Sequence, residues 1–187
     1  ARFLERKPEE ERAFGMLGLL TSKPVLYVCN VEEGSAAAGN DYSKLVMDHA
    51  SKEGAVAVAI SAKIEAEIAT LSRAERTEFL ETLGLEEAGL DRLIRAGYQL
   101  LDLITYFTVG PKEARAWTIN RGTKAPAAAG VIHTDFEKGF IRAETIAYAD
   151  YVALGGEAGA RDAGKLRLEG KEYVVAGGDV MHFRFNT

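Results

Sequence analysis

Two unbroken apolar segments, each ending in polar residues, dominate the first half of the chain. Residues 25–29 and 55–60 are apolar throughout, without the alternation of a half-exposed strand; Asn30 follows the first segment and Ser61 the second. Such runs are typical of strands buried on both faces in a parallel sheet that helices cover. Ligands bind beyond the carboxyl ends of these strands, so the polar residues there are the first candidates for a site.

A helix-length segment from Asp41 to Glu53 separates the two apolar segments, with apolar side chains at helical spacing. Strand, helix and strand in this order form a right-handed crossover, which places the two strand ends side by side. We therefore expect residues 30–33 and 61–63 to be neighbours.

The next segments predict further helices. Ser72 and Glu75 have the spacing of a capping box, so a helix should begin there and end near Gly84. Apolar positions from Leu90 to Ile104 form one stripe, as in an amphipathic helix that packs on the sheet.

From about residue 105 the chain changes to short β-rich runs between glycine-rich turns. These predicted strands are residues 106–109, 114–119, 141–148, 165–168, 173–175 and 180–185. The last run alternates, with Met181, Phe183 and Phe185 on one face and His182 and Arg184 on the other. One helix is expected from 125 to about 132, with Thr123 as its cap. A small mixed sheet wrapped over a helix is the β-grasp plan.

Composition favours a soluble protein with a packed core. The 187 residues are 47% hydrophobic, enough for one large or two small domains. No apolar run approaches the ~20 residues of a membrane span, and no signal peptide is recognisable. The single cysteine, Cys29, lies in an apolar run and indicates a reducing compartment. We expect a cytoplasmic protein without a membrane partner.

Charge differs between the two halves. Residues 1–104 carry 12 basic and 18 acidic side chains, a net charge of −6, and residues 105–187 carry 11 and 10, a net charge of +1. The two values give the −5 of the whole chain. A near-neutral second half is compatible with an RNA-rich partner but does not require one.

The two strand ends resemble the base-recognition half of a P-loop NTPase of the translation-factor class. Residues 30–33, Asn-Val-Glu-Glu, stand where most members carry Asn-Lys-x-Asp, whose aspartate grips guanine, and residues 61–63 read Ser-Ala-Lys. The glutamate in place of that aspartate, within TSKPVLYVCNVEE, is similar to the YchF subfamily of Obg-like ATPases. That resemblance implies a preference for ATP.

The resemblance also implies which residues bind the base. They are Asn30, Val31, Glu33, Ser61, Ala62 and Lys63. An asparagine can pair with the N6 donor and N7 acceptor of adenine, whereas an aspartate suits the two N–H donors of guanine. Glu33 is one methylene longer than aspartate and should be displaced from that position. A strand-end turn with ordinary polar residues is the alternative interpretation.

The second half resembles a TGS domain, a β-grasp module with a ubiquitin-like fold. The matching segments are residues 117–119 (Trp-Thr-Ile), 131–136 (Val-Ile-His-Thr-Asp-Phe) and 178–183 (Gly-Asp-Val-Met-His-Phe). Residues 148–164 form an insert that the YchF group also carries. The resemblance implies docking on the ribosome, through the large subunit or the 70S particle, or on tRNA-like RNA.

The expected fold class is therefore α/β followed by α+β. Residues 1–20 end a helical or coiled-coil insert; residues 21–104 form the C-terminal part of a P-loop nucleotide-binding domain, a parallel sheet with flanking helices; residues 105–187 form the TGS domain. Neither Gly-x-x-x-x-Gly-Lys-Ser/Thr nor, in the first domain, Asp-x-x-Gly occurs. The phosphate loop, the Mg²⁺ ligands and the catalytic residues for Mg-ATP are thus expected outside this chain.

Two functional hypotheses follow. In the first, the parent protein is a ribosome-associated ATPase that hydrolyses GTP less well, and this chain is inactive alone. In the second, the chain is a non-enzymatic ribosome- or RNA-binding module; a GTP-preferring member of the same family is a further alternative.

Other tempting features have plainer explanations. His133 and Asp135 are interpreted as a helix-end turn, and three histidines without ligand spacing argue against a metal site. The glycines at 155–164 are interpreted as a flexible loop.

Overall fold

The chain divides into two compact units at the junction of Leu101 and Asp102, and each is described separately. The structure is a computed structural model, and it describes residues 1–186. Thr187, the last residue of the expected second domain, lies outside the described residues. Across residues 1–186, none of the helices has the length and apolar character needed to cross a membrane.

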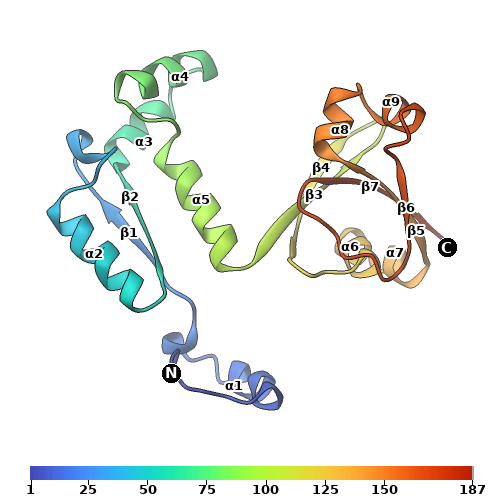
Figure 1. Cartoon of the computed structure of the whole chain (residues 1–187), viewed down its shortest axis with the longest axis horizontal. Helices are drawn as coiled ribbons and strands as arrows, with labels where there is room; N and C mark the ends of the chain where they lie inside the picture. Colours follow the sequence, from blue (N-terminus) through green and yellow to red (C-terminus); the bar gives the residue numbers. More distant parts are fainter. Residues whose placement is uncertain (187) are drawn as a thin grey trace. The chain divides into compact units, whose positions relative to one another are not determined.

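A β-α-β crossover forms the centre of the first unit, as the apolar pattern predicts. Strand β1 (Leu26–Asn30), helix α2 (Asp41–Lys52) and strand β2 (Val56–Ile60) follow one another, and the two strands pair in parallel. The Asn40 side chain begins α2 by accepting a hydrogen bond from the Ser43 backbone N–H at 2.9 Å. Figure 1 shows α2 on one side of the sheet and α5 (Gly89–Leu100) on the other.

The expectation that both strands are buried on both faces is wrong for this chain. Val28 in β1 is 46% exposed and Val56 in β2 is 36% exposed. The sheet has two strands, and within residues 1–186 β1 has no second strand neighbour. Two helices cover only part of so narrow a sheet, so the apolar run leaves part of its surface in water.

Helices α3 (Ala62–Ile68), α4 (Arg73–Thr82) and α5 follow the sheet. The predicted capping box of Ser72 and Glu75 is confirmed at the start of α4. The predicted apolar stripe is too long, because α5 ends at Leu100. Asp102 has a φ of 51°, which turns the backbone out of the helix, and Ile104 therefore lies in a strand.

The first 25 residues contain little regular structure. The 3₁₀ turns η1 (Pro8–Glu10) and η2 (Leu20–Ser22) flank one short helix, α1 (Glu11–Met16). Several apolar side chains of this segment are exposed, among them Phe3, Met16 and Leu20. Pro8 and the glycine after Phe14 both weaken a longer helix here.

A five-stranded mixed sheet forms the second unit. Its strands are β3 (Leu103–Val109), β4 (Ala114–Asn120), β5 (Phe140–Ala147), β6 (Arg167–Glu169) and β7 (Asp179–Phe185). The spatial order is β4-β3-β7-β5-β6. Strands β3 and β7 pair in parallel and the other pairs are antiparallel. The strand expected at 173–175 is only an isolated bridge between Lys124 and Val174.

Small side chains let helix α6 (Ala125–Ile132) approach this sheet closely. Ala125, Ala128 and Ala129 are fully buried against it. The Tyr106 hydroxyl, also fully buried, donates a hydrogen bond to the Ala128 carbonyl at 2.9 Å, and burial raises the pKa of this hydroxyl. The expected cap at Thr123 is wrong, because its hydroxyl donates to the Asn120 carbonyl instead.

The predicted alternation of the last strand is confirmed. Met181 and Phe183 are buried and Phe185 is half-buried, while His182 and Arg184 are exposed. The buried side chains join Tyr106 and Ile119 in the core of this unit.

The glycine-rich insert is more ordered than a flexible loop. It contains the short helices α8 (Tyr148–Ala153) and α9 (Glu157–Asp162), on the opposite side of the sheet from α6 and α7 (Thr134–Lys138) in Figure 1. Gly155 and Gly156, with φ values of 72° and 112°, make the turn between α8 and α9. The glycines therefore serve a tight helix–helix connection.

A buried carboxylate fastens the loop that precedes β7. Asp179, 3% exposed, accepts hydrogen bonds from the Tyr173 hydroxyl at 2.6 Å, the Ala176 N–H at 2.9 Å and the Arg167 guanidinium at 3.1 Å. Burying a carboxylate is unfavourable unless its oxygens are paired, and here both oxygens are used. This cluster links β6, the loop and β7.

We predict that Asp179→Ala lowers the free energy of unfolding by about 3 kcal/mol, because the Tyr173 hydroxyl, the Ala176 N–H and the Arg167 guanidinium all lose their acceptor. Tyr173→Phe is the matched control; it keeps the carboxylate but removes the hydroxyl that donates to Asp179 and accepts from Arg167, and it should cost about 1 kcal/mol. Urea denaturation followed by circular dichroism measures both. Equal losses in the two variants would contradict the central role of the carboxylate.

Candidate functional site

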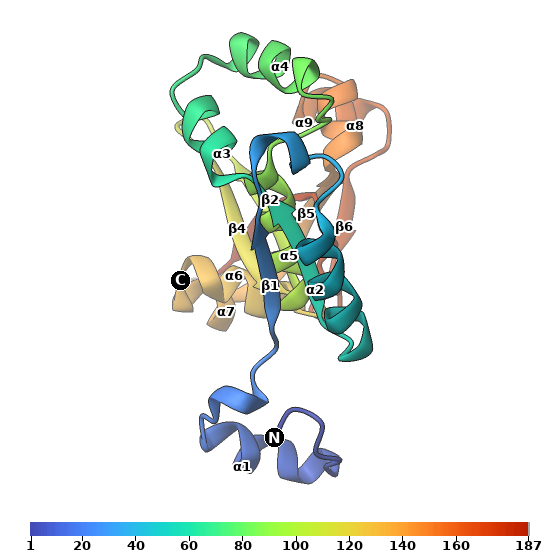
Figure 2. The ribbon, with the colours of Figure 1, turned by 90° about the vertical axis from the view of Figure 1, so that its left-hand side faces the viewer.

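The polar ends of β1 and β2 lie side by side, as the crossover predicts, and Figure 2 shows the two strands together. Asn30 is opposite Ile60 in the ladder, and the Val31 N–H donates to the Ile60 carbonyl at 2.8 Å. Beyond the ladder, the Asn30 Oδ1 atom accepts a hydrogen bond from the Ala62 N–H at 3.0 Å. One side chain thus ties the end of β1 to the first turn of α3.

A pocket of about 380 Å³ opens at this edge of the sheet. Its lining residues are Asn30, Val31, Glu32, Glu33, Gly34, Ser61 and Lys63. Five of the six residues expected to bind a base line it, and Ala62 contributes through its N–H to Asn30. The structure therefore brings the predicted residues together.

Glu33 and Lys63 form an ion pair at the pocket between the two strand-end segments. The Glu33 carboxylate accepts a hydrogen bond from the ammonium and raises the pKa of Lys63. Both side chains are substantially exposed, so the pair is screened by water and adds little stability. The ion pair affects the position of the two side chains, because each restricts where the other can lie.

Val31 and Ser61 contribute differently from the exposed members of the site. Their exposed fractions are 7% and 2%, so Val31 packs into the unit and the Ser61 side chain is almost enclosed. Within the part of the chain that the structure describes, the Ser61 Oγ has no hydrogen-bond partner. Val31 and Ser61 can therefore form the wall of the pocket and present their backbone to it. Asn30, Glu33 and Lys63 present polar side-chain groups that can bind a ligand.

Glu32 also lines the pocket, and sequence reasoning gave it no role. Its carboxylate accepts hydrogen bonds from the Ser35 hydroxyl and, at 3.2 Å, from the Asn40 amide. The bond from Ser35 is the main cause that lowers the pKa of Glu32. Glu32 therefore holds the loop that runs through η3 (Glu33–Ser35) to the start of α2. The spacing of three residues between Glu32 and Ser35, which fits one helical turn, is the sequence feature that could have predicted this role.

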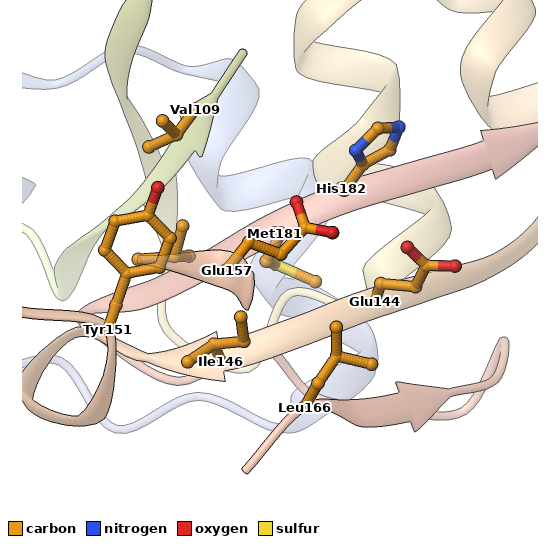
Figure 3. Close-up of a pocket in the computed structure, with 9 residues that line it drawn as sticks. Val109, Glu144, Ile146, Tyr151, Glu157, Leu166, Met181 and His182 are labelled. Atoms are coloured by element: carbon orange, nitrogen blue, oxygen red, sulfur yellow. The ribbon is translucent and has the colours of Figure 1, made fainter. Parts of the chain in front are cut away.

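A second cluster of ionisable groups lies in the other unit, where Figure 3 shows Glu144, Glu157 and His182 with apolar neighbours. The cavity among them has a volume of only about 10 Å³, room for about one water molecule. Arg184 binds both oxygens of Glu144, at 3.2 and 3.0 Å, and lowers the pKa of that carboxyl. The cluster therefore joins β5 to β7 and leaves no space for a substrate.

His133 lies in the turn that ends α6, as expected, and its side chain also caps the next helix. Its Nδ1 atom accepts a hydrogen bond from the Asp135 N–H at 3.2 Å and begins α7. Within residues 1–186 no three histidine, cysteine or acidic side chains are grouped as metal ligands would be.

Residues 159–165 have the glycine and lysine spacing of a phosphate loop, but Leu166 stands where serine or threonine is required. Gly159 lies inside helix α9, and Lys165 pairs with Asp150 at 3.6 Å. The segment also lacks the strand that would precede a phosphate-binding loop. This spacing therefore does not mark a phosphate site.

We predict that Asn30→Ala weakens the link between the two strand-end segments. Loss of one hydrogen bond of about 1 kcal/mol should make the Ala62 amide exchange about fivefold faster, measured by hydrogen–deuterium exchange. Glu33→Gln is the control, because it keeps Asn30 in place and should leave that amide unchanged. Equal exchange in both variants would show that Asn30 does not hold the turn.

Comparison with known proteins gives consistent matches over the whole chain. The family model YchF-GTPase_C, described as a protein of unknown function, matches residues 103–186. The Ribosome-binding ATPase YchF of Bacillus subtilis is 56% identical over 189 residues, which cover 100% of this chain and 52% of that protein. Obg-like ATPase 1 of Rattus norvegicus is 43% identical over 172 residues, covering 90% and 43%.

A solved structure agrees with these relatives. The Schizosaccharomyces pombe YchF GTPase has a TM-score of 0.85 and 37% identity, covering 98% of this chain and 49% of that chain. The chain thus spans about half the length of the curated relatives it matches. It belongs to the YchF family and corresponds to the C-terminal half, including the C-terminal domain of that family.

Proposed function

We propose that the parent protein is a ribosome-associated ATPase and that this chain supplies the half-site that recognises the adenine base. The observation that carries the proposal is the hydrogen bond from the Ala62 N–H to Asn30, which positions an amide at the mouth of a 380 Å³ pocket. Relatives named ribosome-binding ATPases support the assignment. In this proposal, residues 21–104 are the C-terminal part of a P-loop nucleotide-binding domain.

After its bond to Ala62, and within the described residues, the Asn30 side chain still has one acceptor site and its N–H donors free to bind adenine. Its Oδ1 atom uses one of two lone pairs on Ala62, so the second can accept the adenine N6–H while the Nδ2 atom donates to N7. Val31 and Ser61 form the enclosed wall, and the stem of Lys63 covers the base. All three line the pocket.

Glu33 explains why guanine would be the weaker ligand. Guanine needs a carboxylate that accepts its N1–H and N2–H donors, but the carboxylate of Glu33 is paired with Lys63. Guanine binding would have to redirect this carboxylate from Lys63 to the base, whereas adenine binding leaves the pair in place. The name of the Schizosaccharomyces pombe relative includes GTPase, so a GTP-preferring member of the family is the alternative that nucleotide selectivity must decide.

The second unit is proposed to be a TGS domain with a β-grasp fold. The strand order β4-β3-β7-β5-β6, with a parallel central pair and helix α6 against one face, supports this assignment. We propose that this unit docks on the ribosome, through the large subunit or 70S particle, or on tRNA-like RNA. A cytoplasmic location follows from that partner.

The chemistry of phosphate transfer is assigned to the part of the parent protein outside this sequence. Phosphoryl transfer depends on a phosphate-binding loop, Mg²⁺ ligands and a positioned water. The sequence contains neither of the motifs that provide them. ATP is therefore the proposed ligand as Mg-ATP in the complete protein, with this chain holding its base.

We predict that Val31→Lys combined with Glu33→Asp in the intact protein shifts selectivity toward GTP by about tenfold or more, because a carboxylate one methylene shorter can take the position that accepts the guanine donors. Calorimetric titration with ATP and GTP measures the ratio. Glu33→Gln is the control and should not gain affinity for GTP. Unchanged selectivity in the double variant would refute these roles.

We further predict that the isolated 187-residue chain sediments with ribosomes yet releases no phosphate from ATP above background. Binding should weaken as salt rises if RNA phosphates are contacted. Phosphate release that follows the purified protein through chromatography would contradict the assignment of phosphoryl transfer to the part of the parent protein outside this sequence. Absence of ribosome binding by this chain would remove the docking role of the second unit.

A further inference from the structure

Strand β4 ends the sheet of the second unit and presents a free backbone edge. Among the residues that the structure describes, β3 is its one strand neighbour. The Gly110 N–H donates to the Glu113 carbonyl at 2.9 Å, and the Arg121 N–H to the Asp102 carbonyl at 2.7 Å. These bonds show that odd-numbered residues of β4 face β3, because hydrogen-bonded pairs alternate along an antiparallel ladder.

The even-numbered residues therefore direct their backbone groups outward. Ala114 and Ala116 are both exposed, and over residues 1–186 no hydrogen bond occupies their N–H or carbonyl groups on this side. Their methyl side chains do not obstruct an approaching strand. A stretch of about three residues is thus available for backbone pairing.

Grooves flank this edge on both faces of the sheet. The groove on the α6 side has a volume of about 530 Å³ and a mostly apolar wall that includes Trp117, Ile132, Phe136 and Phe185. The groove on the other side has a volume of about 380 Å³ and includes Phe107, Tyr148, Tyr151 and Val152. A strand added to an edge sends successive side chains to opposite faces, so each groove can receive every second side chain.

Two cations stand beside the free edge. The Arg115 guanidinium lies over the Trp117 ring, 4.3 Å from its centroid, and Lys112 lies in the hairpin before β4. Neither makes an ion pair within the described part of the chain, and neither does Glu113 between them. The net charge of this rim is positive, which favours an acidic residue in the partner.

In the register centred on Arg115, a second copy of β4 is a poor occupant of the same edge. Antiparallel pairing of two identical edges centred on the free stretch would place Arg115 opposite Arg115. Like charges directly opposite one another are destabilising in a sheet. An acidic, apolar peptide has no such conflict.

We propose that the β4 edge binds an extended peptide of another protein by strand addition. The peptide pairs with the backbone of Ala114 and Ala116, places apolar side chains in both grooves and sets an acidic residue against Lys112 and Arg115. This binding is independent of the nucleotide site, because every group that it uses belongs to the second unit.

The test uses the 187-residue chain and a fluorescein-labelled peptide, Asp-Asp-Val-Ile-Val-Ile-Thr, in a fluorescence anisotropy titration. We expect saturable binding. Ala116→Pro should weaken it at least tenfold, because proline removes the outward N–H and is tolerated at a strand edge where that group is not in the ladder. Ala116→Ser is the matched control and should bind within about twofold of the original chain. A cooperative thermal unfolding transition verifies that both variants fold.

A charge-reversal variant tests the proposed acidic contact independently. Arg115→Glu should lower affinity for the acidic peptide about tenfold and should favour a peptide with lysines in place of the aspartates. Equal binding by the folded proline and serine variants would overturn the strand-addition mode. So would a lack of saturable binding up to about 1 mM, or a chain that forms a dimer through β4 and ignores the peptide.

Discussion

The hydrogen bond between Asn30 and the Ala62 N–H is the interaction on which the candidate site depends. Parallel pairing alone brings the ends of β1 and β2 to the same edge, but it does not fix the segments beyond them. The asparagine side chain extends the connection past the last ladder bond and sets where α3 begins. Two further interactions complete the pocket: Glu33 pairs with Lys63, and Glu32 holds its loop through Ser35 and Asn40.

The second unit depends on a different constraint, the close approach of a helix to a sheet. Three buried alanines on α6 leave room for the Tyr106 ring, and the buried Tyr106 hydroxyl donates a hydrogen bond to the Ala128 carbonyl of that helix. On the opposite face, the α8–α9 insert covers strands that would be open to water. The sheet is therefore covered on both faces, while its β4 edge stays accessible.

The sequence predicts the elements whose causes are local. Both apolar strands, the Ser72 cap and the alternation around Phe183 depend on neighbouring residues, and the structure contains all of them. Features that depend on the rest of the fold could not be predicted from the local sequence. Val28 is exposed because the sheet is only two strands wide. Helix α5 ends early because of the backbone conformation of Asp102. The Thr123 hydroxyl donates to the Asn120 carbonyl and does not cap α6.

Strand β7 has a consequence for biosynthesis. It is the last strand of its unit along the chain but lies at the centre of the sheet, between β3 and β5. During vectorial synthesis the hairpin of β3 and β4 can form early, yet it has no central neighbour until β7 leaves the ribosome. The unit must therefore complete its sheet in one late step that joins its two ends, a non-local pairing of the kind that slows folding.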